Sequence, residues 1–141
     1  MKTKVSKVFV VLAVAAVIGL PAVYAQSPVM LKADVPFDFT IGNQDFSAGE
    51  CTVQAFSTDV TVIRNLDTRQ AKIVLTNAVL AGKTPSEAKL IFHRYGERYF
   101  LAQIWTPANV YGRQLPKSKA EREMAASHAK RDTVAVAAVV R

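Results

Sequence analysis

The sequence predicts an all-β domain, an antiparallel sandwich or small barrel, with one short C-terminal helix after a signal peptide. Three observations lead to this prediction. Hydrophobic and polar residues alternate through most of the chain after residue 30, which is the period of half-buried strands. Turn-forming residues separate these runs at short intervals. One capped, alanine-rich segment follows near the C-terminus.

The first 25 residues have the order of a secretory signal peptide. Three lysines precede thirteen apolar residues, Val8–Leu20, and small residues then predict cleavage between Ala25 and Gln26. A retained membrane anchor is the alternative, but thirteen residues are fewer than the roughly 20 that span a bilayer. We therefore expect a secreted protein, periplasmic or extracellular, with no stable membrane span after cleavage.

The charge of the mature chain is modest. The full chain carries a net charge of +7, and removal of the three signal-peptide lysines lowers it to +4. Residues 34–115 contain eight basic and eight acidic side chains. Nucleic-acid binding needs a clustered basic face on the folded domain, so this neutral body argues against such a partner.

The β domain is predicted over residues 26–115. Its first strand is expected over residues 31–41, where Pro36 indicates an edge, a bend or a bulge because proline cannot donate to a ladder. Further strands are expected over residues 49–56, 60–66 and 71–80. Cys51 alternates with Val53, which places this lone thiol in the core. An intermolecular disulfide or a reactive thiol is the alternative for an odd cysteine.

A hairpin is the clearest local element. Gly96 and Glu97 form a two-residue loop between strands over residues 88–95 and 98–106, and glycine at the first position predicts a type II′ turn. In the resulting register, Arg94 opposes Tyr99, Phe92 opposes Leu101 and Leu90 opposes Gln103. Both faces are mostly apolar, so we expect this hairpin to be covered on both sides. Residues 107–115 are predicted to form a loop.

Helical sequence follows. Ser118 and Glu121 form a capping box, in which the serine accepts a backbone hydrogen bond and the glutamate reaches back. The helix is expected within residues 116–131. The apolar run Val134–Val140, within residues 132–141, forms either a final strand on the sheet or a poorly ordered tail.

Catalytic motifs are missing from the sequence. It has two histidines and one cysteine, without zinc spacing, a phosphate-binding glycine loop or a nucleophile elbow. We expect His93 to be partly buried with a satisfied partner, and His128 to lie on the surface near the helix end. Four carboxylates could supply a glycosidase pair, but on outward strand positions we expect them to be solvated: Asp34, Asp38, Asp45 and Glu50. The chain is therefore predicted to be no enzyme, with no metal and no cofactor.

Arginine and tyrosine side chains form the predicted recognition surface. They lie at the hairpin tip and in the following loop: Arg94, Tyr95, Arg98, Tyr99, Tyr111 and Arg113. Arginine stacked on tyrosine can bind a glycan, a carboxylate ligand or an acidic partner. The alternative is cross-strand packing that stabilises the turn and binds nothing.

Four segments together resemble a family of small, uncharacterised exported bacterial β-rich proteins. They are residues 35–42 (VPFDFTIG), 48–50 (AGE), 95–101 (YGERYFL) and 112–118 (GRQLPKS). Relatives often carry Pro-Ala-Gly before a tyrosine, whereas Ser47 precedes Ala48 here and Cys51 takes the aromatic place. The resemblance implies export and a β domain, and it implies no activity and no catalytic residue.

Three functions are consistent with these observations. The first is an exported, non-enzymatic β domain that binds a partner or an envelope or extracellular surface. The second is a carrier of a small apolar ligand, held in a cavity of the barrel. The third, an exported hydrolase, is the least favoured because the catalytic motifs are missing.

Overall fold

The computed structural model describes residues 29–127 and 130–141, which contain eleven strands and one helix. The predicted signal peptide, its Ala25–Gln26 cleavage site and His128 lie outside these residues. The strands are β1 (Met30–Val35), β2 (Phe39–Ile41), β3 (Gln44–Phe46), β4 (Gly49–Ala55), β5 (Val60–Asn65), β6 (Ala71–Leu75), β7 (Asn77–Leu80), β8 (Ala88–Tyr95), β9 (Arg98–Trp105), β10 (Tyr111–Gln114) and β11 (Arg131–Val140). The helix is α2 (Lys119–Ala126). The predicted all-β class with one short C-terminal helix is confirmed.

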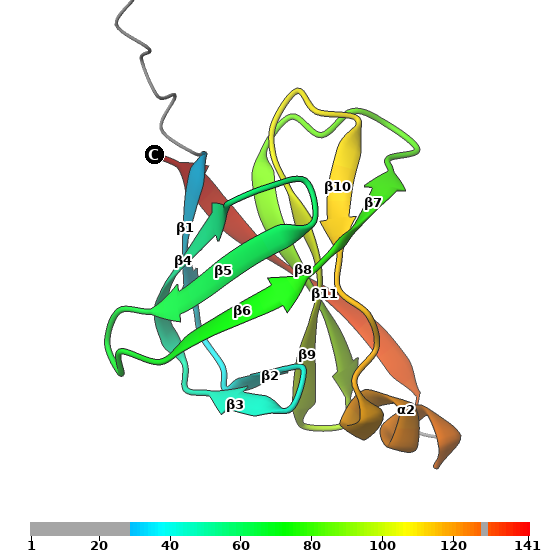
Figure 1. The fold of residues 1–141 in the computed structure, drawn as a ribbon. Helices are drawn as coiled ribbons and strands as arrows, with labels where there is room; N and C mark the ends of the chain where they lie inside the picture. Colours follow the sequence, from blue (N-terminus) through cyan, green and yellow to red (C-terminus); the bar gives the residue numbers. More distant parts are fainter. Residues whose placement is uncertain (1–28, 128–129) are drawn as a thin grey trace, which may run out of the picture.

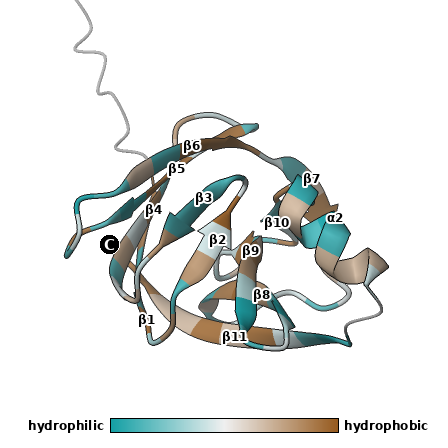
Figure 2. Cartoon of the chain, turned by 90° about the horizontal axis from the view of Figure 1, so that it is seen from below, coloured by the Kyte–Doolittle hydropathy of each residue, from teal (hydrophilic) through white to brown (hydrophobic). Residues whose placement is uncertain are grey.

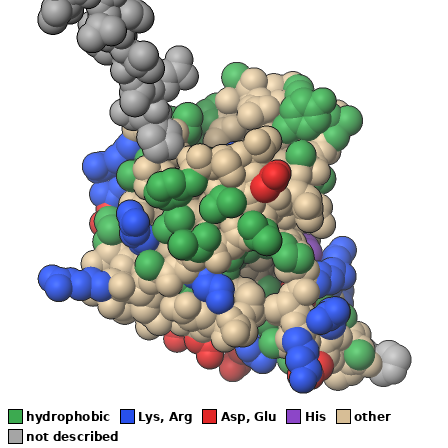
Figure 3. Space-filling model, in the orientation of Figure 1, with side chains coloured by type: hydrophobic (Ala, Val, Ile, Leu, Met, Phe, Trp, Pro, Cys, Tyr) green, Lys and Arg blue, Asp and Glu red, His purple; other side chains and the backbone are tan. Residues whose placement is uncertain are grey.

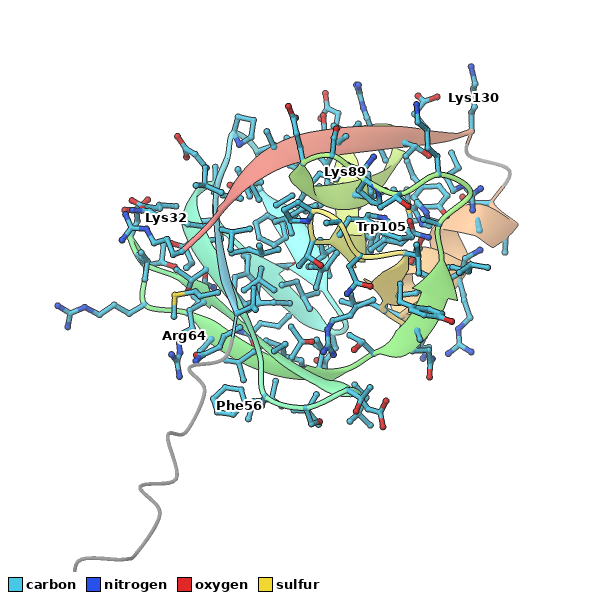
Figure 4. The ribbon with its side chains drawn as sticks, turned by 90° about the horizontal axis from the view of Figure 1, so that it is seen from above. Lys32, Phe56, Arg64, Lys89, Trp105 and Lys130 are labelled. Carbon is cyan, nitrogen blue, oxygen red and sulfur yellow. The ribbon has the colours of Figure 1, made fainter. Side chains whose placement is uncertain are left out.

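The strands form one sheet that curls into a nearly closed barrel (Figure 1). Neighbouring strands follow the order β3-β2-β9-β8-β11-β1-β4-β5-β6. Only Thr76 separates β6 from β7, and β7 pairs with β10, which in turn pairs with β9. The sheet therefore returns to β9 from its other side. Seen from above, the strands surround the side chains of the interior (Figure 4).

β3 and β6 are the strands at the two ends of the sheet order. At the lower end of the barrel in Figure 1, side-chain hydrogen bonds connect the segments around these two strands. Gln70 Nε2 donates to the carbonyl of Asp45 at 2.8 Å, and its Oε1 accepts from the Ser47 amide at 3.2 Å. Lys72 Nζ donates to Asn43 Oδ1 at 2.7 Å. The β2–β3 hairpin thus lies across this end of the barrel (Figure 2). Its pairing with β9 is the one parallel contact in the described sheet.

The core fills the barrel from the inward-facing positions of the strands. It contains Val35, Phe39, Ile41, Phe46, Cys51, Ile63, Leu90, Phe92, Leu101 and Ile104. Cys51 is 0% exposed, which confirms that its thiol points into the core. Burial raises the pKa of this thiol to about 11, and the nearby carboxylates of Asp67 and Asp34 raise it further. A buried, protonated thiol is a weak nucleophile.

The C-terminal segment is a strand of the barrel. β11 pairs with β8 over eight residues and with β1 over three. Its inward side chains include Val134 and Val136, which pack against the core. Figure 2 shows β11 as a largely hydrophobic strand along one wall. Residues 131–140 therefore belong to the same domain as the strands that precede them.

The hairpin has the predicted turn but a different register beyond its middle. Arg94 opposes Tyr99 as expected, and Gly96 has the positive φ of 62° that the first position of a type II′ turn requires. A bulge between Ile91 and Phe92 then shifts the pairing, so that Leu90 opposes Ile104 rather than Gln103. Alternation of apolar and polar residues does not reveal the extra residue of a bulge here. The predicted register and the observed register both place apolar side chains on both faces of the hairpin.

Two short strands were not predicted. Residues 111–114 form β10 rather than a loop, and residues 44–46 form β3. Each has only three or four residues, and Gly112 in the first carries turn-like chemistry. Both are strands because distant segments, β7 and β9 or β2, supply their hydrogen-bond partners.

Helix α2 packs against the outer face of the β8–β9 hairpin near its turn (Figure 1). Ser118 is its N-cap, and its hydroxyl accepts from the Glu121 amide at 3.1 Å, as predicted. The Glu121 carboxylate points to the hairpin rather than back to the cap. Within the described residues, no helix has the length and apolarity needed to cross a membrane.

Candidate functional site

The hairpin-tip arginines make contacts within the protein. Arg94 Nε donates to the Gly96 carbonyl at 2.7 Å, and its guanidinium lies 5.6 Å from the centroid of the Tyr99 ring. The Arg98 guanidinium lies 5.0 Å from the centroid of the Phe100 ring. The contact between Arg94 and Tyr99 is the cross-strand packing that the sequence offered as the alternative to binding, whereas Arg98 and Phe100 lie on the same strand.

Tyr95 is buried beneath α2, so its side chain is not part of an exposed surface. It is 1% exposed, and its hydroxyl donates to Glu121 Oε1 at 3.2 Å. His93 Nδ1 lies 2.6 Å from the same oxygen, which gives this partly buried histidine the partner expected for it. Burial raises the pKa of the Tyr95 hydroxyl, and the negative charge of Glu121 raises it further. One buried carboxylate thus holds the helix to the hairpin.

A polar depression of about 620 Å³ lies at the hairpin tip. Arg98 and Tyr99 line it together with Asp38, Asp45, Glu97 and Gln70. Many of its polar groups are hydrogen-bonded within the chain: Asp45 Oδ1 accepts from Thr40 Oγ1 at 2.8 Å, and Asp38 Oδ1 accepts from the Ala48 amide at 2.8 Å. Its lining contains no histidine, cysteine or lysine.

The remaining two candidates lie at the other end of the barrel, on β10 (Figure 1). Tyr111 opposes Leu80 of β7, and these side chains are 58% and 66% exposed. Val110 and Val29 are also exposed, and Val29 and Tyr111 line the same hollow. We call Val29, Leu80, Val110 and Tyr111 the open-end surface. The structure therefore divides the six candidate residues between two ends of the molecule.

Arg113 connects three segments at the end of the barrel where the open-end surface lies. Its Nη1 donates to the carbonyl of Thr58 and lies 3.4 Å from the hydroxyl of Thr76. These bonds connect β10 to the turn before β5 and to the junction of β6 and β7. Arg113 also lines two hollows of about 440 and 400 Å³, the first beside Val29 and the second beside Tyr111.

The interior hollow at this end is small. It has a volume of about 60 Å³ and is lined by Leu31, Val53 and Ile104. The Thr61 hydroxyl, which also lines it, has no hydrogen-bond partner among the described residues. Pockets for small ligands usually measure about 300–1,000 Å³, and this volume holds about two waters. This hollow therefore gives no support to the ligand-carrier alternative.

Two residues of the site were missed by sequence reasoning. Glu121 was expected only as a helix cap, because its position in the capping box gives no sign of the distant hairpin. Leu80 was expected only as a strand residue, since its pairing with Tyr111 depends on the unpredicted β10. The adjacent apolar residues Val79 and Leu80, of which an alternating strand can bury only one, and Tyr111 in a segment rich in turn formers were the signals that could have found the open-end surface.

Within residues 29–127 and 130–141, no three histidine, cysteine, aspartate or glutamate side chains lie close enough to hold a metal ion. No protein-family model, curated protein or solved structure matches this chain.

Proposed function

We propose that the chain is an exported, non-enzymatic binding domain that engages a protein partner in the envelope or the extracellular space. The observation that supports this proposal best is the exposed pair formed by Tyr111 and Leu80 at the open end. Exposed apolar side chains that lie together and are rimmed by polar groups often mark protein-binding sites.

The composition of the open-end surface fits a protein partner. Tyrosine is enriched at the centres of protein interfaces, because it buries a large ring and keeps a hydroxyl that can form a hydrogen bond. Asn109 and Arg113 lie beside Tyr111 and supply polar groups at the rim. Arg113 also fixes the neighbouring turn through Thr58, so the surface is held in place before binding.

A binding assay with matched variants tests this proposal. The full chain is expressed, its mature form is purified from the exported fraction, and partners are captured from the envelope fraction and identified by mass spectrometry. Binding of each purified partner is then measured. We expect Tyr111→Ser and Leu80→Ser each to weaken binding at least about tenfold, as for a central interface residue. Arg94→Ala, at the hairpin tip, is the control and should bind normally.

Two results would contradict the proposal. Loss of binding in Arg94→Ala, with normal binding in Tyr111→Ser, would show that the binding surface is at the hairpin tip. Turnover of an ester, glycan or peptide substrate that a point substitution abolishes would show that the protein is an enzyme.

Export has a separate test. The mass of the protein recovered from outside the cytoplasm should correspond to a chain that starts at Gln26. A chain that lacks its first 25 residues should stay inside the cell. Recovery of the intact chain in the membrane fraction would instead support the retained anchor.

A further inference from the structure

The outer face of β5 and β6, with the turn that follows β4, presents hydrophobic side chains to solvent (Figure 3). Val62 opposes Ile73 and Val60 opposes Leu75, so these four residues share one face, on which Val62 is buried and Val60 is half-buried. Ile73 and Leu75 are each 68% exposed. Phe56 bonds to Val60 through the backbone, extends the same face and is 59% exposed. We call Phe56, Val60, Ile73 and Leu75 the β4–β6 patch.

The two ends of this patch carry opposite charges. Arg64 is exposed on the same face, opposite Ala71, and it points away from the barrel on the same side as Phe56 (Figure 4). Asp59 is exposed at the other end, in the turn that precedes β5. Five residues at about 3.3 Å each separate the two by about 16 Å. Figure 3 shows basic side chains on one side of the hydrophobic row and an acidic side chain on the other.

We infer that a second copy of this chain packs face to face on the β4–β6 patch, with the strands of the two copies antiparallel. A two-fold axis through the middle of the patch, near Ile73, brings Arg64 of each copy to Asp59 of the other. The hydrophobic side chains of the two copies then cover one another. The arrangement is self-complementary in charge and in hydrophobicity.

Other occupants fit this face less well. Parallel packing of two copies would place Arg64 against its own counterpart, and like charges repel. An anionic membrane surface would attract Arg64 but would repel Asp59 at the other end. The patch shares no residue with the open-end surface, so the dimer goes beyond the proposed function and does not depend on it.

Charge reversal tests the orientation of the two copies. Sedimentation velocity across a concentration series, on protein purified after expression of the full chain, measures the dimer dissociation constant. Arg64→Asp and Asp59→Arg should each weaken the dimer at least about tenfold, because each places like charges together. The double variant with both changes restores opposite charges and should return to within about threefold of the unchanged protein.

Apolar substitutions test the patch itself. Ile73→Ser and Leu75→Ser together should leave the protein monomeric at concentrations where the unchanged chain is dimeric. Val139→Ser is the matched control, because Val139 is 67% exposed but lies on β11, away from the patch. Circular dichroism and the melting temperature of diluted protein show whether each variant is folded, so loss of the dimer is separated from loss of the fold.

Two outcomes overturn the inference. One is an unchanged chain that stays monomeric at millimolar concentration, including the case in which it binds phosphatidylglycerol vesicles through Phe56 and Ile73. The other is a dimer that the Ser variants leave intact, since another surface must then hold the two copies. Failure of this dimer leaves the Tyr111 binding assay unaffected, because that assay uses other residues.

Discussion

The outer face of the β8–β9 hairpin and the outer face of β5 and β6 both carry large apolar side chains, but the described part of the chain covers only those of the first. On the hairpin, Tyr95, Phe100 and Trp105 are buried outside the main core, beneath α2 and against Gly112 of β10. On the other face, Ile73 and Leu75 remain exposed.

The two faces differ in the polar groups that they present to an element packing against them. The hairpin presents His93 and Tyr95, whose polar atoms both meet the Glu121 carboxylate, so a helix can bury this face without an unpaired charge. The β4–β6 patch has no such partner from the described residues, and its charges lie only at its ends. The hairpin face is therefore covered by a helix of the same chain. The β4–β6 patch is suited to being covered by a second copy of the chain.

The largest expected effect comes from the carboxylate that holds the helix. Glu121→Ala leaves the polar atoms of His93 and Tyr95 buried without their partner, and we expect a loss of about 3 kcal/mol in the free energy of unfolding. Urea denaturation measures it. Glu123→Ala, an exposed change on the same helix, should cost less than about 0.5 kcal/mol. Equal effects for the two variants would show that Glu121 does not hold the helix.

The next effect comes from the close contact on the same covered face. A Cβ at Gly112 would lie 2.6 Å from an atom of the Trp105 ring, so Gly112→Ala forces the ring or the strand to move. We expect a loss of about 2 kcal/mol, which thermal unfolding can measure. Gly82→Ala is the control, because nothing lies within 4 Å of the added atom. A neutral Gly112→Ala would mean that Trp105 is loosely packed.

Tyr95→Phe should have a smaller effect that depends on pH. Loss of the hydrogen bond to Glu121 should cost about 1 kcal/mol at neutral pH. The raised pKa of Tyr95 means that its stabilising contribution is complete below about pH 10 and is lost as the pH rises through the folded-state pKa. The variant should therefore lose stability less steeply above about pH 10 in alkaline denaturation. Tyr111→Phe, on the exposed surface, should follow the unchanged protein, and an equally steep loss in Tyr95→Phe would contradict the assignment.

The smallest effect is expected on the bare face. Ile73→Thr keeps a β-branched side chain at an exposed position, so the diluted monomer should change by less than about 0.5 kcal/mol. Ile63→Thr, on the inner face of β5, places a hydroxyl in the core and should cost at least about 2 kcal/mol. Similar losses in the two variants would show that Ile73 is covered within the monomer.

The local features of the fold were predictable because neighbouring residues decide them. Alternation placed Cys51 in the core, Gly96 set the hairpin turn, and Ser118 marked the helix start. The bulge at Ile91 was not predictable, because alternation is satisfied in both registers. β10 and β3 were missed because short strands form only where distant strands offer hydrogen bonds.

The candidate site was predicted less well than the fold. Residue types indicated a surface made of arginine and tyrosine, and six residues were named for it. The type of a residue does not say where its side chain points. In the structure Tyr95 is buried, and Tyr111 lies at the opposite end of the barrel from Arg94. The β4–β6 patch was not foreseen, because alternation on β6 looks the same whether or not an element covers it.

From the sequence alone, an export signal is predicted, and it stays a prediction. The sequence by itself also determined a run of strands and a capped helix near the C-terminus. Those properties follow from local periodicity and from single-residue conformational preferences. Only the tertiary structure decided that the last strand lies between β8 and β1, that Glu121 bonds to the hairpin, and that the described residues leave one apolar face uncovered. These outcomes depend on contacts between residues far apart in the chain, which no local pattern specifies.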